Sequence, residues 1–292
     1  MASGIIIIDK PAGWTSQDVA AKLRGVFHER RVGHGGTLDP MATGVLPVFI
    51  GRATRAVEFF EAADKEYVAG LRLGAETDTQ DITGTVLQEK PVSVTPLQLQ
   101  ETLARFVGPC QQLPPMYSAI KIGGKKLYEL ARQGKTVERK PRDIQLKELE
   151  LLEGQGSEYL FRVLCSKGTY VRTLCHDLGQ ALGCGGCMSS LRRTKAGCYD
   201  LTQAVTMDAL LQAEDPTAYL LPVDSLFAHL PSLTVEQKHL KAIYNGNILP
   251  FSCPDGLYRV YAPDGSFLMV GRSEQGQLKT EKSFFEVTDR ET

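Results

Sequence analysis

The stretch GHGGTLDP at residues 33–40 constrains the fold most, because it can continue neither a helix nor a regular strand. Its three glycines allow tight turns and the close approach of a large planar group. Pro40 pushes the backbone of Asp39 towards extended geometry. We therefore predict a rigid loop that presents one carboxylate at the floor of a cleft. An isolated Leu-Asp-Pro is more often a structural turn, so these residues alone leave a turn-capping role for Asp39 open.

Short apolar or β-branched segments between turn residues predict strands around this loop. They lie at residues 5–8, 44–50, 65–73, 84–87, 144–152 and 159–166, and residues 74–81 are predicted to form a polar loop. Thr15 is the expected N-cap of a first helix, with Asp18 at the capping-box position. Further helices are predicted at 53–63, 95–106 and 127–132, at 168–182 after a strand end, and, with polar breaks, at 204–226.

The length and the turn pattern predict two domains. A chain of 292 residues exceeds the size of about 150 residues expected for one domain. Beyond Pro231 the chain consists of short segments separated by Asn245-Gly246-Asn247, Pro254-Asp255-Gly256 and Pro263-Asp264-Gly265. Such turn signals are typical of a small β-rich domain. We expect a larger domain at residues 1–230 and the β-rich one at residues 231–292.

Charge is unevenly distributed along the chain. The formal net charge is -1, but residues 121–142 contain eight basic and two acidic side chains. This run belongs to a Gly- and Pro-containing segment at residues 111–141, which we predict to be a surface insertion that closes on a ligand. Its lysines, among them Lys121, Lys125 and Lys126, favour a phosphate-bearing partner. Ordinary solvated faces are the alternative that charge alone leaves open.

The N-terminus and the cysteines indicate a cytoplasmic protein. The segment MASGIIIIDK has no basic n-region, and its apolar run is far shorter than the roughly 20 residues of a membrane span. The seven cysteines, an odd number, favour reduced thiols over a disulfide framework. We therefore expect no membrane association.

Two groups of residues suggest metal or glycosidase chemistry. Cys184 and Cys187 form a Cys-x-x-Cys pair, but Cys175 and Cys198 do not supply the second well-spaced pair that a structural zinc site usually has. Buried thiols beside a glycine turn are the preferred interpretation, and zinc is the alternative. The acids at positions 78 and 81 have neither a calcium-type loop nor a matching second acid, which favours a solvated polar loop.

Arg172 is the candidate partner for Asp39. A catalytic aspartate must be oriented, shielded from water and kept ionised. Arginine does the last of these well, because it stays protonated and pairs with a carboxylate through two N–H groups. Arg172 lies in the segment CSKGTYVR, far from Asp39 in sequence, so their contact is an expectation only.

Six segments together resemble one known family. They are DKP with Gly13 and Thr15-Ser16, GHGGTLDPMATGVLP, Lys65-Glu66-Tyr67, TDTQD at residues 77–81, PPMYSAIKIGGKKLYELAR, and CSKGTYVRTLCHDLG with LRRTKAG. Their order over about 200 residues resembles that of the bacterial tRNA pseudouridine synthase B family. The resemblance implies an α+β pseudouridine synthase fold, with a mixed, largely antiparallel central sheet flanked by helices and loops. The C-terminal region more weakly resembles a PUA domain, a small RNA-binding β domain.

The resemblance also implies roles for individual residues. Asp39 matches the catalytic aspartate, Arg172 the arginine that pairs with it, and Tyr67 the tyrosine that stacks on the target uracil and takes part in proton transfer. The matches for RNA binding are His34, which enters the opened T loop, and the nucleotide-pocket residues Tyr170 and Leu191. Residues 111–141 match a mobile segment that folds onto RNA. For Asp78 and Asp81 the resemblance implies a role near the active cleft, beside the solvated-loop interpretation. Position 35 departs from the pattern, because it is Gly where many relatives have Thr or Ala.

The implied reaction is the isomerisation of uridine to pseudouridine at position 55 in the T loop of tRNA. The N1–C1′ bond breaks, the uracil turns, and a C5–C1′ bond forms, with no cofactor or metal. The resemblance does not settle whether Asp39 adds to C1′ or removes a proton from C2′. A flipped uracil needs an aromatic surface such as Tyr67. A non-catalytic tRNA-binding or tRNA-folding protein is the alternative function, and a monomer without an obligate protein partner is the default expectation.

Overall fold

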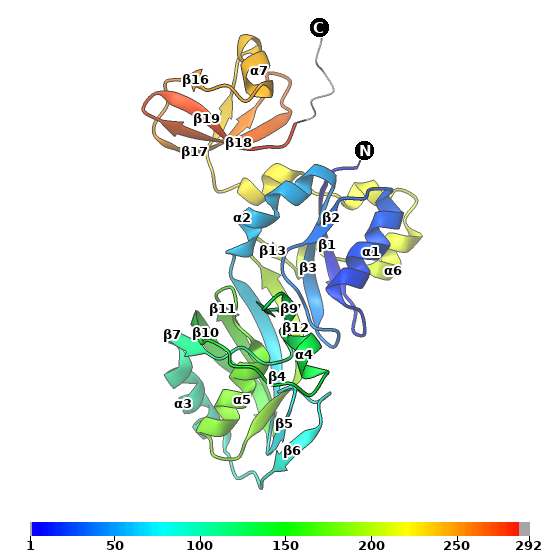
Figure 1. Cartoon of the computed structure of the whole chain (residues 1–292), viewed down its shortest axis with the longest axis vertical. Coiled ribbons are helices and arrows are strands. Elements are labelled where there is room, and N and C mark those ends of the chain that lie inside the picture. The colour runs from blue at the N-terminus through cyan, green and yellow to red at the C-terminus, as the bar shows by residue number, and fades with distance from the viewer. Residues whose placement is uncertain (1, 286–292) are drawn as a thin grey trace.

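The computed structural model describes residues 2–285 and contains a large sheet and a small C-terminal sheet at one end of the long axis (Figure 1). No helix in this part of the chain is long and apolar enough to cross a membrane. The helices are α1 Ser16–Phe27, α2 Val57–Glu61, α3 Pro96–Phe106, α4 Leu127–Ala131, α5 Val171–Ala181, α6 Met207–Gln212 and α7 Gln237–Tyr244. The 3-10 helices are η1 Gly51–Ala56, η2 Leu201–Gln203, η3 Pro216–Tyr219 and η4 Val223–Phe227.

The large sheet has the strand order β14-β1-β3-β12-β4-β11-β10-β7, with β2 paired to β3 and β13 paired to β12. Its strands are β1 Gly4–Lys10, β2 Val32–His34, β3 Thr43–Ile50, β4 Lys65–Leu73, β7 Gly108–Gln112, β10 Arg142–Gln155, β11 Glu158–Cys165, β12 Gly186–Ala196, β13 Tyr199–Asp200 and β14 Val205–Thr206. The pairs β1 with β14 and β3 with β12 are parallel, and the other strand pairs given for this sheet are antiparallel. The predicted mixed, largely antiparallel α+β fold is therefore confirmed.

Several local predictions are confirmed closely. The four consecutive isoleucines at residues 5–8 form the centre of β1 and are at most 1% exposed. Thr15 caps α1: its side chain accepts from the Asp18 N–H, and the Asp18 carboxylate accepts from the Thr15 N–H. Strand β4 has the predicted bounds. Helix α5 packs on β12 and β4, and α3 packs on β10, so these helices cover the part of the sheet that carries β4.

Other predictions about elements were wrong or incomplete. The tract 204–226 is helical with breaks, as predicted, but its helical residues are divided among the short helix α6 and the 3-10 helices η3 and η4, and it begins with the unpredicted strand β14. Strand β12 was missed, because charged residues obscure its alternation and one of its inward positions is the buried Arg193. Helix α7 was missed as well. The predicted helix at residues 53–63 is split between η1 and α2.

The boundaries of two loops also differ from the prediction. Residues 74–81 include strand β5, Ala75–Thr77, which pairs with β6, Val86–Glu89, in a separate hairpin. Gln111 and Gln112 belong to the edge strand β7 rather than to the insertion. The rest of the insertion contains a small hairpin of β8, Lys121–Ile122, and β9, Lys125–Lys126, followed by α4.

The small sheet has the order β15-β17-β18-β19-β16, which confirms the predicted β-rich C-terminal region. Its strands are β15 Ser232–Thr234, β16 Leu249–Pro250, β17 Gly256–Tyr261, β18 Phe267–Glu274 and β19 Gln277–Ser283. The predicted turn Pro254-Asp255-Gly256 precedes β17 and Pro263-Asp264-Gly265 follows it, as expected from their Asp-Gly pairs.

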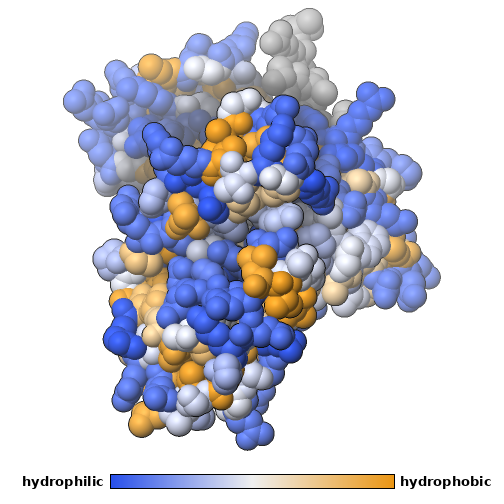
Figure 2. All heavy atoms as spheres, turned by 60° about the horizontal axis from the view of Figure 1, so that its bottom comes forward, coloured by the Kyte–Doolittle hydropathy of each residue, from blue (hydrophilic) through white to orange (hydrophobic). Residues whose placement is uncertain are grey.

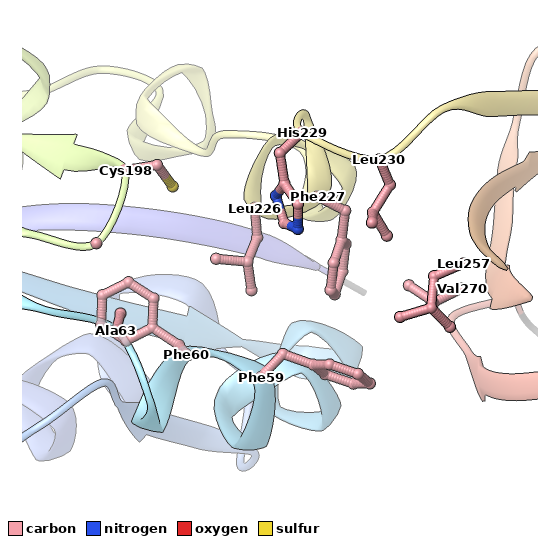
Figure 3. A pocket seen from close by; sticks show the side chains of 11 residues that line it. Phe59, Phe60, Ala63, Cys198, Leu226, Phe227, His229, Leu230, Leu257 and Val270 are labelled. Atoms are coloured by element: carbon pink, nitrogen blue, oxygen red, sulfur yellow. The ribbon is translucent and has the colours of Figure 1, made fainter. Parts of the chain in front are cut away.

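An apolar joint of Phe59, Phe227, Phe267 and Phe284 connects the two sheets. Phe227 lies edge-on to Phe59 at a centroid distance of 5.2 Å, and Phe267 stacks on Phe284 at 5.3 Å. Beside the joint is a cavity of about 240 Å³, lined by α2, by η4 and the residues after it, and by β17 and β18 (Figure 3). The joint buries aromatic area on both sides, so the small sheet is packed against the large one rather than only tethered to it.

Candidate active site

The loop that carries Asp39 is fixed on both sides of that residue. The buried Ser16 hydroxyl accepts from the Leu38 N–H at 2.9 Å and donates to the Leu38 carbonyl at 3.3 Å. On the other side, the Pro40 carbonyl accepts from the Gly13 N–H at 2.8 Å and from Lys10 Nζ at 3.3 Å. Hydrogen bonds to the flanking peptide groups restrict the backbone, so the direction of the Asp39 side chain is set before any ligand binds.

Asp39 and Arg172 meet as expected. Arg172 Nε lies 2.9 Å from Asp39 Oδ2, and Nη2 donates to Oδ1 at 3.3 Å. The arginine side chain is 6% exposed, whereas that of Asp39 is 35% exposed and open on one side. Burial raises the pKa of Asp39 above its ordinary value, and the Arg172 guanidinium opposes that rise. The pair provides an oriented carboxylate that remains accessible to a ligand.

Arg172 is itself held by two further segments. Its Nη1 donates to the Thr79 carbonyl at 3.2 Å, and its Nη2 donates to the Tyr117 carbonyl at 2.8 Å. Asp81 lies 3.8 Å from Nη1 and is anchored by the hydroxyl and N–H groups of nearby threonines. The predicted solvated loop is therefore wrong for Asp81, which is buried next to Arg172. The contact with Tyr117 connects the insertion directly to the Asp39 pair.

Tyr67 lies on β4 in the centre of the sheet, where it pairs with Arg193 on β12 and Val163 on β11. Its side chain is 9% exposed. Burial raises the pKa of the Tyr67 hydroxyl, while the neighbouring Arg193 guanidinium opposes the rise and Asp39 adds to it. The Tyr67 phenol and the Asp39 carboxylate are therefore close enough to influence each other electrostatically.

The other predicted RNA-binding residues lie near this centre on three elements. His34 ends β2, its Nδ1 is buried without a partner among the described residues, and burial lowers its pKa. Leu191 lies on β12, two residues before Arg193, and is 8% exposed. Tyr170 precedes α5, and its backbone N–H and carbonyl bond the Gln112 side chain at 2.7 and 3.0 Å. The ordered start of α5 also positions Arg172, its second residue.

The predicted phosphate-binding lysines lie farther out on the insertion. Lys121 and Lys125 are exposed on β8 and β9. Lys126 Nζ lies 5.4 Å from the centroid of the Tyr128 ring, and the Arg132 guanidinium lies 5.3 Å from the same centroid. Within residues 2–285 no hydrogen bond or ion pair joins these lysines to Asp39. They form an outer basic surface and are not part of the carboxylate centre.

The molecular surface at the end that carries β5 and β6 is mainly hydrophilic (Figure 2). Its hydrophobic side chains form small separate patches on this face. Polar groups rather than an extended apolar surface are therefore available there to a ligand, as is usual for surfaces that contact nucleic acid.

The cysteines do not gather into one cluster. Cys175, Cys184 and Cys187 are buried, the last two beside the positive-φ residues Gly183 and Gly185, as the buried-thiol interpretation expected. Cys198 is exposed, contrary to that expectation. In the described part of the chain no three His, Cys, Asp or Glu side chains are grouped so that they could hold a metal ion.

Sequence reasoning gave no role to three residues that shape this site. They are Lys10, whose pKa is lowered to about 8 chiefly by burial, Ser16 and Arg193. All three lie in segments that carried the family resemblance, which was the one available signal. Lys10 donates to the nearby Pro11 and Trp14 carbonyls, but its contact with Pro40 and the contacts of Ser16 and Arg193 join segments distant in sequence, and no spacing pattern encodes such contacts.

Comparison with known families decides the relationship. A TruB family pseudouridylate synthase N-terminal domain matches residues 24–171, and a tRNA pseudouridylate synthase B C-terminal domain matches residues 172–228. The chain belongs to the TruB family. As a TruB family member it is similar to tRNA pseudouridine synthase B of Syntrophomonas wolfei, with 45% identity over 92% of the chain and 93% of the relative. It is 47% identical to the Ralstonia pickettii protein of that name over 85% of the chain and 80% of the relative.

A solved structure shows the same TruB-type fold. The chain is similar to a protein in a Cbf5-Nop10-Gar1 complex, with a TM-score of 0.74 and 28% identity over 97% of this chain and 85% of that one. The match extends across the small C-terminal sheet as well as the large one. It supports the PUA-like description of that sheet, and the family makes the TruB-type chain a pseudouridine synthase.

Proposed function

We propose that this protein isomerises uridine to pseudouridine at position 55 in the T loop of tRNA. The observation that carries the proposal is the accessible Asp39 carboxylate, fixed by two contacts with Arg172 in a chain of the TruB family. Two similar relatives bear the name tRNA pseudouridine synthase B, which supports tRNA as the substrate.

Asp39 acts on the ribose in this proposal. Its ionised carboxylate either adds to C1′ or removes the proton from C2′, and each route weakens the N1–C1′ bond. Arg172 keeps the carboxylate charged in a partly buried site and fixes both of its oxygens. Because isomerisation leaves the oxidation state unchanged and consumes nothing, the reaction needs no cofactor.

The uracil must leave the stacked T loop to reach Asp39. Extrusion of a base costs about a few kcal/mol. Stacking on the Tyr67 ring offsets about 1 to 3 kcal/mol of this cost. We assign Leu191 and Tyr170 to the walls of the pocket and His34 to the space that the uridine leaves in the RNA.

The outer basic surface of the insertion, with Lys121, Lys125 and Lys126, is proposed to bind tRNA phosphates and set the register of the RNA. We treat residues 1–230 as the catalytic domain and residues 231–292 as a PUA-like RNA-binding domain. We further propose a cytoplasmic protein that acts as a monomer without an obligate protein partner.

The test uses an unmodified T-arm stem-loop with tritium at C5 of its uridines and no added cofactor. Release of tritium and a pseudouridine at position 55 support the proposal, and binding without conversion contradicts it. Asp39→Asn is expected to bind the RNA without converting it. Full conversion by Asp39→Asn would remove Asp39 from the mechanism. The non-catalytic tRNA-folding alternative predicts that Asp39→Asn retains all activity, and the relatives' names do not favour it.

A further inference from the structure

Arg193 is a fully buried cation at the centre of the site. Its residue is 1% exposed. Its Nε donates to the Val45 carbonyl at 2.6 Å, and its Nη2 donates to the Gly36 carbonyl at 3.2 Å. It faces Tyr67 across the antiparallel pair of β12 and β4. The ion pairs found in residues 2–285 include Arg172 and Arg192 but not Arg193.

This arrangement is electrostatically unfavourable for the fold itself. Burial of a charge without an ionic partner is costly, and an apolar side chain would fill the same space without that cost. The surrounding groups add to the problem, because the Arg193 charge disfavours the protonated forms of Lys10, His34 and Lys65. A buried, unpaired guanidinium among three potential cations therefore points to a use other than packing.

Tyr67 is the neighbour that benefits from this charge. Three neighbouring groups change the pKa of the Tyr67 hydroxyl. They are Arg193 on β12, Cys165 on β11 and Asp39 in the glycine-rich loop. Burial raises the pKa of Tyr67, and the negative charges of Asp39 and of an ionised Cys165 raise it further. Arg193 is the residue opposite Tyr67 on the paired strand β12, and its positive charge lowers the pKa of Tyr67.

We propose that Arg193 is a positioning residue for the isomerisation: it holds a positive charge beside Tyr67, and this charge allows Tyr67 to exchange a proton with the uracil. This inference rests on the proposed function. It assigns the acid-base work to Tyr67 and the electrostatic support to Arg193, whereas Arg172 supports Asp39.

The proton count of the reaction is consistent with this assignment. Uridine carries a hydrogen on C5, and pseudouridine carries one on N1 instead. Ionised Tyr67 takes the C5 proton and becomes the phenol, while the C5–H electron pair returns to the ring. N1 takes one proton from solvent, and Tyr67 then returns its proton to solvent. One proton leaves and one arrives, so no co-reactant is needed.

Two substitutions separate charge from hydrogen bonding. Arg193→Gln keeps donors for the Val45 and Gly36 carbonyls but removes the charge, and Arg193→Lys keeps the charge with a single donor group. Arg192→Gln is the matched control, because this neighbouring residue is 42% exposed and pairs with Asp9 at 2.8 Å. Thermal unfolding and filter binding establish that each variant is folded and binds the stem-loop.

The readout is the single-turnover rate of tritium release as a function of pH. We expect Arg193→Gln to reduce the single-turnover rate about 10- to 100-fold. This is a substantial part of the acceleration that one acid-base group supplies. Arg193→Lys should lose less, and Arg192→Gln should retain the wild-type rate. Without the charge Tyr67 ionises at higher pH, so the rise of the rate with pH should shift upwards in Arg193→Gln. RNA affinity should be unchanged.

A double-mutant cycle with Tyr67→Phe decides whether Arg193 acts through Tyr67. In the Tyr67→Phe protein Arg193→Gln should cause no further loss, because the hydroxyl that it supports is absent. The same fold-loss in both backgrounds overturns the inference and assigns Arg193 to the shape of the loop. A wild-type rate and pH profile in Arg193→Gln overturns it as well. If that variant does not fold, Arg193→Met, which also removes the charge, replaces it in the same cycle with the same criteria. If the wild-type protein releases no tritium, the proposed function itself fails.

Discussion

Replacement of Arg172 tests the Asp39 centre most directly. The guanidinium reaches both carboxylate oxygens, at 2.9 and 3.3 Å, whereas the ammonium of Arg172→Lys can retain one such contact. A hydrogen bond to a charged group contributes about 1.5 to 3 kcal/mol. Since 1.4 kcal/mol corresponds to about a factor of ten, Arg172→Lys should reduce the rate about 10- to 150-fold with RNA binding intact.

Arg172→Met removes the charge as well. Asp39 and Asp81 then face each other without a cation, and loss of one partner of a buried pair costs about 3 to 5 kcal/mol. Because the Asp39 side chain is 35% exposed, water offsets part of the cost of losing the ion pair. We therefore expect Arg172→Met to lower the free energy of unfolding by about 2 to 3 kcal/mol. The pKa of Asp39, already raised by burial, should rise further because Arg172 opposes that rise.

The sign of the pH effect follows from the role of Asp39 as an ionised group. The rate falls as the pH drops through the pKa of Asp39 in the folded protein, so a higher pKa moves the acidic limb to higher pH. Tritium release from the stem-loop between pH 5 and 8 measures this limb, and denaturant unfolding measures the stability. A lysine variant with the wild-type rate, or a methionine variant with an unchanged acidic limb, refutes the reasoning.

Four further outcomes are expected. Gly35→Ala should destabilise the protein by about 1 to 3 kcal/mol in denaturant unfolding, because a Cβ there would lie 2.5 Å from Phe60. Ser16→Ala should cost about 1 to 3 kcal/mol and lower the rate of tritium release more than RNA affinity, since the Leu38 peptide groups lose their partner. Phe284→Ala should cost about 3 kcal/mol and allow the small sheet to melt at a lower temperature than the large one in calorimetry. Dialysis against a metal chelator should leave the rate of tritium release unchanged.

Local signals in the sequence predicted local structure well. Thr15 and Asp18 are three residues apart, and the capping box depends only on that spacing. The isoleucines of β1 are buried on both faces, so their uninterrupted run identified the strand. The meeting of Asp39 and Arg172 could be expected from chemistry and from the family resemblance, but only the folded chain brings the two atoms to 2.9 Å.

Features that depend on distant segments could not be predicted in this way. Arg193 belongs to a residue type that is mostly exposed in folded proteins, yet the large sheet buries it on β12, between β3 and β4. Asp81 lies in a polar stretch that predicted an exposed loop, and its burial results from the approach of α5. Arg193 is satisfied by carbonyls far away in the sequence, whereas Asp81 accepts hydrogen bonds from Thr79 and Thr83 and only its contact with Arg172 is distant. Nothing local in the sequence shows that either residue is covered by other segments.

Gly35 and Phe60 have a consequence for the history of the family. A methyl group at position 35 and the Phe60 ring would occupy the same space, with Phe49 closing the remaining side at 3.2 Å. A lineage that acquires either side chain while the other is present therefore loses stability. We expect homologues with Thr or Ala at position 35 to carry a smaller residue at position 60. An ancestor with glycine at position 35 and a small residue at position 60 could have given rise to both combinations without a clash.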